Sequence, residues 1–224
     1  MTGASSLSTP TRQRVACIHV HHGNIAYLDE VLAALDADGV HYVDPGLLAR
    51  LTRDDSFSDA DGRSRTVEQL AWMAAAGADA LVVTCTAYAA LVPAEPNLAM
   101  PVLVVDEPLF ESICASARPR RLFFTNPSTV EPTITRLRDY AAARGVDCDF
   151  TVELIPEAFE LFVAGRAADH DALLASSLES LTRADAGGSA FAMQLSMTTA
   201  ARRVAGMANP LDSLARALAQ TLGR

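Results

Sequence analysis

Short apolar runs alternate with longer amphipathic segments along most of the chain. The runs with the length and composition of buried strands are residues 15–20, 41–44, 80–84, 102–106, 121–125, 150–155 and 190–195. Between them apolar residues recur at helical spacing, first in 25–35. The pairs Thr66–Gln69 and Ser128–Glu131 form capping-box patterns that predict helix starts. Apolar strands that alternate with helices predict an α/β fold with mostly parallel sheets covered by helices on both faces.

This pattern repeats along the chain. The matching pairs are VACIHVHHGN (15–24) with RLFFTNPST (121–129), VVTCTA (82–87) with QLSMTT (194–199), and VLVVDEPLFESI (102–113) with ANPLDSLARAL (208–218). Three pairs in the same order predict two α/β halves, residues 14–105 and 118–208, related by a pseudo-twofold axis. We expect residues 1–13 to be a disordered lead-in. Two such halves bring their strand ends to one cleft, where open parallel sheets bind ligands.

Composition excludes several classes of function. The net charge of −9 argues against a nucleic-acid partner. No apolar run reaches the ~18 residues of a membrane span, and the N-terminus lacks the apolar region of a secretory signal, so a cytoplasmic protein is expected. All 18 basic residues are arginine, so the chain can form neither a pyridoxal phosphate aldimine nor a Walker A loop. Because no glycine-rich dinucleotide loop is present either, we expect no cofactor.

Cysteine placement indicates one candidate nucleophile. The four cysteines are Cys17, Cys85, Cys114 and Cys148. They form no CxxC pair, which argues against a zinc ribbon or a disulfide framework. Cys85 stands between Thr84 and Thr86 where a buried strand meets a predicted helix start, and the free N–H groups of a helix start favour a thiolate. The alternative is that Cys85 is simply a small buried residue, as free cysteines often are.

The segment HVHHGN at the end of the first strand is the second candidate. His19 and His21 share one face of the strand, and His22 follows them. An imidazole, with its pKa near ~6.5, suits general acid or base catalysis at neutral pH. Two other interpretations remain: solvent-exposed loop histidines, or a metal site completed by His41 or Asp44.

Taken together, these residues resemble the aspartate/glutamate/hydantoin racemase superfamily, from about residue 14 onward. TCTA (84–87) is similar to the family's first Cys-Asn-Thr loop, and SMTT (196–199) to its second, Gly-Cys-Thr-Glu loop. The segment 122–147 is similar to the family's mid-chain strand and Thr-initiated helix. This sequence departs from the family at three positions: Met197 replaces the second cysteine, Thr199 the glutamate and Thr86 the asparagine.

The resemblance implies cofactor-independent and metal-free chemistry in the cleft, and a C-terminal helix, 209–224, that crosses back to the first half. In the family two thiols face each other across the substrate α-carbon. Met197, at the second-cysteine position, cannot exchange a proton. Either His21 or His22 is then the second proton carrier, or the reaction needs only Cys85. Relatives with one catalytic cysteine decarboxylate malonates, and others isomerise a double bond through a cysteine.

By the same resemblance, polar residues at strand ends hold the substrate carboxylate. They are Asn24, Thr84, Thr86, Thr125, Asn126, Ser128, Thr129, Thr198 and Thr199. Ser128 and Thr129 are equally interpretable as helix caps. The leading hypothesis is an isomerase or racemase that acts on a small carboxylate or amino-acid-like substrate through Cys85. The alternatives are a decarboxylase on the same scaffold and a small-molecule-binding protein without turnover. We expect a homodimer or a higher homo-oligomer.

Overall fold

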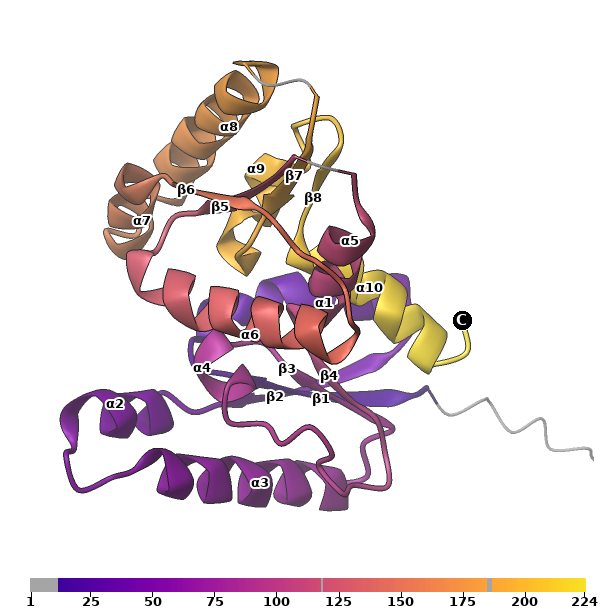
Figure 1. Ribbon diagram of the computed structural model, residues 1–224. Helices are drawn as coiled ribbons and strands as arrows, with labels where there is room; N and C mark the ends of the chain where they lie inside the picture. Colours follow the sequence, from indigo (N-terminus) through magenta and orange to yellow (C-terminus); the bar gives the residue numbers. More distant parts are fainter. Residues whose placement is uncertain (1–11, 118, 185–186) are drawn as a thin grey trace, which may run out of the picture.

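The fold consists of two parallel four-stranded sheets, one in each half of the chain. The computed structural model describes residues 12–117, 119–184 and 187–224. The strand orders are β2-β1-β3-β4 and β6-β5-β7-β8, and each neighbouring pair is parallel. The two α/β halves predicted from the hydrophobic pattern are therefore confirmed (Figure 1).

The two halves follow nearly the same order of elements. The first contains β1 (Arg14–His19), the 3-10 turn η1 (His22–Asn24), α1 (Ile25–Ala34), β2 (Asp38–Val43), α2 (Gly46–Arg53), α3 (Asp59–Ala75), β3 (Ala80–Val83), α4 (Thr86–Ala89), β4 (Val102–Val104) and α5 (Glu107–Ala115). The second contains β5 (Arg120–Phe124), η2 (Pro127–Thr129), α6 (Val130–Ala143), β6 (Thr151–Leu154), α7 (Pro156–Val163), α8 (Ala167–Ala184), β7 (Ser189–Ala192), η3 (Leu195–Met197), α9 (Thr198–Ala201), β8 (Met207–Ala208) and α10 (Pro210–Thr221). Across the described ranges, no helix combines the length and apolar character needed to span a bilayer.

The central strand of each sheet is buried on both faces, as its continuous apolar run predicts. In β1, Val15 and Cys17 face α1 and α10, whereas Ile18 faces α3 on the other side of the sheet. In β5, Leu122 faces α5 and α6, whereas Phe123 faces α8. Both β1 and β5 are therefore enclosed by helices on their two faces.

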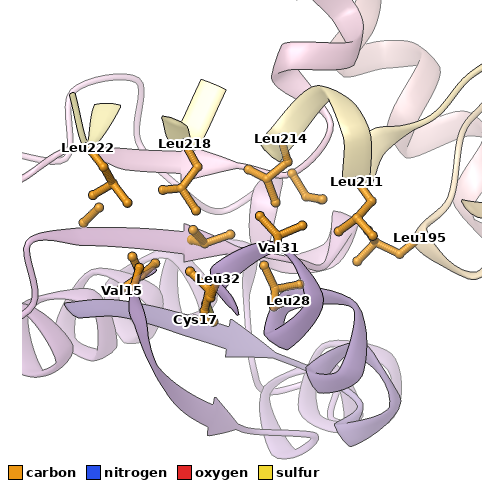
Figure 2. Packing of buried hydrophobic residues seen from close by; sticks show 14 residues of the cluster. Val15, Cys17, Leu28, Val31, Leu32, Leu195, Leu211, Leu214, Leu218 and Leu222 are labelled. Atoms are coloured by element: carbon orange, nitrogen blue, oxygen red, sulfur yellow. The ribbon is translucent and has the colours of Figure 1, made fainter. Parts of the chain in front are cut away.

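The last helix of each half packs on the sheet of the other half. In α10, Leu211, Leu214 and Leu218 are fully buried in the core around β1 and α1 (Figure 2). In α5, Leu109 and Phe110 are fully buried in the core of the second sheet. The two helices also contact each other. Each buried side chain of this size contributes roughly 1.5–3 kcal/mol, so the exchange joins the two halves firmly.

Two helix starts differ from the expected capping boxes. The helix α3 begins earlier, behind Ser58, whose hydroxyl accepts the N–H of Asp61 while the Asp61 carboxylate accepts the N–H of Ser58. Thr66 is an interior residue of that helix. Before α6, the side chain that caps the first turn belongs to Asn126, which accepts the N–H of Ser128. For α3 the upstream Ser58 is a stronger capping residue than Thr66, whereas Asn126 and Ser128 are capping residues of similar strength.

The first half begins slightly earlier than predicted. Residues 1–11 of the expected lead-in lie outside the described residues. Arg12 forms ion pairs with Asp36 and Asp38, and the carbonyl of Gln13 accepts the N–H of Asp38 at 2.8 Å. Arg12 and Gln13 therefore belong to the edge of the first sheet rather than to a disordered segment.

Candidate functional site

A cavity of about 210 Å³ lies where strand ends of the two halves meet. The first half lines it with Val20, His21, Asn24, Thr84, Cys85, Thr86, Val105 and Asp106, and the second with Asn126, Phe159, Phe162, Met193, Gln194, Leu195, Ser196 and Pro210. Four larger hollows within the described residues, of about 420 to 670 Å³, are lined by neither cysteine nor histidine. The smaller cavity is therefore the candidate site, since it combines a thiol with an imidazole.

Strand register shows which residues of the two halves correspond. Val83 ends β3 and Ala192 ends β7 at matching positions beside the central strands β1 and β5. The second residue after each strand is Cys85 in one half and Gln194 in the other. Both have extended backbone angles and both precede a helical turn. Gln194, and not Met197, is therefore the structural counterpart of Cys85.

The expected assignment of Met197 to the second-cysteine position is wrong. Met197 is fully buried in the core of the second half and does not line the cavity. Thr198 and Thr199 also lie outside the cavity lining. The Thr198 hydroxyl is buried without a partner, and Thr199 hydrogen-bonds Tyr27. The repeat between VVTCTA and QLSMTT is three residues out of register with the strand ends, which place the counterpart of Cys85 at Gln194.

Cys85 lies at the strand-to-helix junction, as the sequence predicted, and lines the cavity. Burial raises the pKa of its thiol, hydrogen bonds from the backbone N–H groups of Ala87 and Tyr88 lower it, and the negative charge of Asp106 raises it further. The net direction is upward. The expected activation at the helix start is present, but desolvation outweighs it, and the neutral thiol is the resting form at neutral pH.

The side chain of Gln194 is held in one orientation. Its Oε1 accepts the N–H of Thr125 at 2.7 Å, the hydroxyl of Thr125 at 2.9 Å and the N–H of Asn126 at 3.1 Å. Three donors on one oxygen assign the amide orientation, so both N–H groups of Nε2 remain available to a ligand. Gln194 was missed by the sequence interpretation, which placed it inside a strand. The available signal was a single amide directly after the apolar run AFAM.

The predicted substrate-binding residues in the loop after β5 have different roles. One lines the cavity, and the others stabilise the loop and the helix start. Asn126 lines the cavity, and its Oδ1 accepts both the N–H and the hydroxyl of Ser128. Its Nδ2 is therefore the group free to donate. The hydroxyl of Thr129 donates to the carbonyl of Asn126, and Thr125 supports Gln194. Ser128, Thr129 and Thr125 thus shape the loop and do not line the cavity.

The loop after β1 presents one histidine to the cavity. His21 lines it and occupies the same cap position as Asn126 in the second half, because its Nδ1 accepts the N–H of Gly23 at 3.0 Å. That contact leaves the proton of the neutral ring on Nε2. His22 stacks against His21 with ring centroids 4.3 Å apart, but it is exposed and does not line the cavity. Of the two predicted catalytic histidines, only His21 is in position.

The remaining predicted ligands of the first half lie at the cavity wall. The Thr84 hydroxyl contacts the carbonyl of Ile18 at 3.0 Å and is 3.4 Å from Nδ2 of Asn24. Thr86 also lines the cavity. His19 lies behind Thr84, fully buried, with its Nδ1 2.8 Å from the Thr84 hydroxyl. Burial and the neighbouring His41 lower the pKa of His19 to about 4, so its ring is neutral at neutral pH.

Asp106 is a second cavity residue that the sequence interpretation did not assign. Its side chain is almost fully buried and forms an ion pair with Arg136 of α6, a contact between the two halves. The second carboxylate oxygen, Oδ1, has no partner. A buried carboxylate oxygen without a partner can accept a hydrogen bond from a ligand, and an ammonium group is the strongest such donor.

Comparisons with known proteins identify the fold. No protein-family model and no curated protein matches the sequence. An aspartate racemase homologue from Pyrococcus horikoshii OT3 matches with a TM-score of 0.69 at 11% identity, over 95% of this chain and 100% of that one. A putative Asp/Glu racemase from Yersinia pestis matches with a TM-score of 0.66 at 12% identity, over 95% and 100% of the two chains. The glutamate racemase of Thermus thermophilus, solved with β-chloro-D-alanine, has a TM-score of 0.63 at 17% identity, over 95% and 81%.

Proposed function

We propose, from the premise that the chain has the fold of the aspartate and glutamate racemases, that it is a cofactor-independent isomerase of the racemase type. It acts on a small carboxylate or amino-acid-like substrate, with the Cys85 thiolate as base. The observation that carries the proposal is the cavity itself, where a thiol at one strand end lies across from amide N–H donors at the corresponding strand end. Thiols and amides in one small cavity suit proton transfer next to a carboxylate.

The reaction follows from the positions of the donors. The Cys85 thiolate removes the proton from the carbon beside the substrate carboxylate, and the electron pair moves onto the carboxylate oxygens. Nε2 of Gln194 and Nδ2 of Asn126 donate hydrogen bonds to the charge that develops there. His21, as the imidazolium, then returns a proton to the opposite face from Nε2, which inverts the carbon and leaves a neutral ring. Solvent resets the two groups by protonating His21 and deprotonating Cys85, so protons balance over a turnover.

The lining also limits the substrate. Within the described residues no arginine lines the cavity, so a second substrate carboxylate would meet no cation there. The unpartnered Oδ1 of Asp106 suits an ammonium group, and Phe159, Phe162 and Met193 supply apolar surface. We therefore propose a substrate with one carboxylate, an apolar side chain and, for an amino acid, an ammonium group facing Asp106.

A decarboxylase is the second candidate, and the apolar lining favours it. Cys85 is the one thiol on the cavity among the described residues, and Phe159, Phe162 and Leu195 provide apolar surface. An apolar environment destabilises a substrate carboxylate relative to carbon dioxide. One thiol is then sufficient, because it only has to protonate the carbanion that remains.

One experiment separates these functions. The purified protein is incubated in D2O with a panel of α-amino acids, hydantoins and disubstituted malonates, and each mixture is followed by proton NMR and by carbon dioxide release. Loss of the α-proton signal without carbon dioxide supports the isomerase. Stoichiometric carbon dioxide supports the decarboxylase. If no compound on the panel is changed while several bind, the proposal of turnover is overturned in favour of a binding protein.

A further inference from the structure

A cluster of three metal-ligand side chains lies beneath the cavity, on the face of the first sheet covered by α1. Cys17 and His19 are two residues apart on β1, so they share one face, and His41 of β2 is the register partner of Cys17. One ligating atom from each of the three residues lies within 4.8 Å of the others. Cys17 and His19 are fully buried, and His41 is partly exposed.

Each histidine of this cluster has its outer nitrogen engaged by a second group. Nδ1 of His19 lies 2.8 Å from the Thr84 hydroxyl, and Nε2 of His41 lies 3.1 Å from the carboxylate of Asp29. The two inner nitrogens, Nε2 of His19 and Nδ1 of His41, lie 2.9 Å apart. Metal-bound histidines in proteins show the same pattern, because the outer N–H is held by a carboxylate or another acceptor while the inner nitrogen faces the ion.

The second half shows that the fold does not require polar groups at these positions. By the strand registers, the residues corresponding to Cys17 and His19 on β5 are Leu122 and Phe124, and the residue corresponding to His41 on β6 is Val152. Leu122 and Phe124 are fully buried apolar residues. An apolar trio is therefore compatible with this sheet position. A thiol and two imidazoles in the same place need a separate explanation.

We propose that Cys17, His19 and His41 bind a divalent first-row transition-metal ion, with zinc the best fit. Thiolate and imidazole nitrogens are the ligands that zinc prefers, and in a tetrahedral site they lie about 3.3–3.6 Å from one another. The inner nitrogens need only separate slightly, and the thiol has to approach by at most on the order of 1 Å. One thiolate and the Asp29 carboxylate together balance the charge of a divalent ion.

The site is accessible from the side of Asp29. The side chain of His41 is 14% exposed and that of Asp29 is 61% exposed, whereas Thr84 separates the cluster from the cavity. Three protein ligands leave a fourth position for water, because the Asp29 carboxylate is engaged with the outer nitrogen of His41. In the absence of metal the Thr84 hydroxyl donates to the carbonyl of Ile18 and accepts from Nδ1 of His19, and Nδ1 of His41 donates to Nε2 of His19. Metal binding turns the His41 ring proton outward to Asp29 and releases the thiol proton to solvent.

The test uses the full-length protein, first stripped of metal with a chelator and then dialysed. Zinc alone is titrated by calorimetry, and cobalt alone is followed by absorbance. We expect one zinc per chain with a Kd below about 1 µM, a rise in melting temperature, and a sulfur-to-cobalt charge-transfer band in the near ultraviolet. Cys17→Ser should abolish the band, and His41→Val should weaken zinc at least roughly 10²-fold, the usual cost of disrupting a metal site. Far-ultraviolet circular dichroism checks that both variants fold.

Two control variants exclude other metal sites. Cys114 and Cys148 have their sulfur atoms 3.8 Å apart, and His22 is exposed beside His21, so either pair could bind zinc adventitiously. A Cys114→Ser/Cys148→Ser variant and a His22→Asn variant should both retain one-to-one binding and the cobalt band. The proposal is overturned if zinc binds more weakly than about 1 µM, if the band survives Cys17→Ser, or if either control variant abolishes binding.

Discussion

The two halves of the molecule share one plan of strands and helices, but they carry different chemistry at matching positions. At the end of the third strand the first half has Cys85, and the second half has Gln194. At the cap after the first strand the first half has His21, and the second half has Asn126. Cys85 and His21 thus line the cavity from the first half, and Gln194 and Asn126 line it from the second.

The comparison shows that the fold sets where side chains lie around the cavity. The residue type at each position then decides which chemistry that side chain can perform. A pair of thiols at the two strand ends would make each half both acid and base. Gln194 at this position is an amide that can donate hydrogen bonds but cannot carry a proton. We therefore expect the first half to carry out every proton transfer and the second half to hold the carboxylate.

Removing the only thiol on the described cavity lining should have the largest effect. Cys85→Ser should reduce kcat/KM by more than about 10³-fold, since a hydroxyl is a far weaker base and nucleophile than a thiolate. Cys114→Ser is the matched control, because Cys114 lies in α5 outside the cavity. Steady-state kinetics on the substrate found by the NMR panel make the measurement. Activity of the Cys85 variant within about tenfold of wild type would show that the thiol is structural.

Converting the first half toward the second should have the next largest effect. His21→Asn keeps an acceptor for the N–H of Gly23, as Asn126 does for Ser128, but removes the proton carrier. We expect kcat to fall by about 10²–10⁴-fold, the usual share of a positioned general acid. His22→Asn should leave kcat unchanged because His22 does not line the cavity. Equal losses in the two variants would contradict the assignment of His21.

Removing the amide donor of the second half should cost less. Gln194→Met keeps the side-chain length but loses the two N–H groups together with the Oε1 that accepts from Thr125 and Asn126, and kcat should fall by at least about 10²-fold, as for other single donors to developing negative charge. Gln220→Met, an exposed change on α10, is the control. A rise in KM with unchanged kcat would mean that Gln194 binds the substrate without assisting the transition state.

A new thiol tests which position in the second half faces Cys85. In the Cys85→Ser background, Gln194→Cys should place a thiol on the cavity, whereas Met197→Cys should place it in the core. Iodoacetamide should therefore alkylate the thiol at position 194 at least about tenfold faster than the one at 197, because a buried thiol reacts only after local opening. Mass spectrometry of the two variants gives both rates. The reverse order would restore Met197 as the counterpart of Cys85.

The sequence predicted the fold and one side of the site better than the other. Apolar strands such as VACIHV and RLFFT identified the two parallel sheets, because buried strands must be apolar on both faces. Cys85 was found because its thiol follows a strand directly. Gln194 was missed because the sequence repeat between VVTCTA and QLSMTT is offset by about one helical turn from the ends of the strands. The hydrogen-bonded register of the strands fixes the correspondence, and a sequence repeat does not.

Contacts between distant elements lay beyond sequence reasoning. The pairing of His19 with His41 depends on the register of β1 and β2, and the exchange of α5 onto the second sheet depends on packing between the halves. The upward direction of the Cys85 pKa was also not predictable, since it depends on burial that only the assembled cavity produces.

The rate of Cys85 alkylation as a function of pH tests most directly the central claim, which is that Cys85 is the base in the substrate cavity and has a pKa raised by burial. Only the thiolate reacts, so a pKa raised by burial means that reactivity is lost as pH falls and continues to increase above the ordinary cysteine value of about 8.5. The account predicts a midpoint above that value for Cys85 in the intact protein, measured by mass spectrometry with iodoacetamide, and slower alkylation when the substrate saturates the cavity. A midpoint at or below the ordinary value, or alkylation that saturating substrate leaves unchanged, would contradict it.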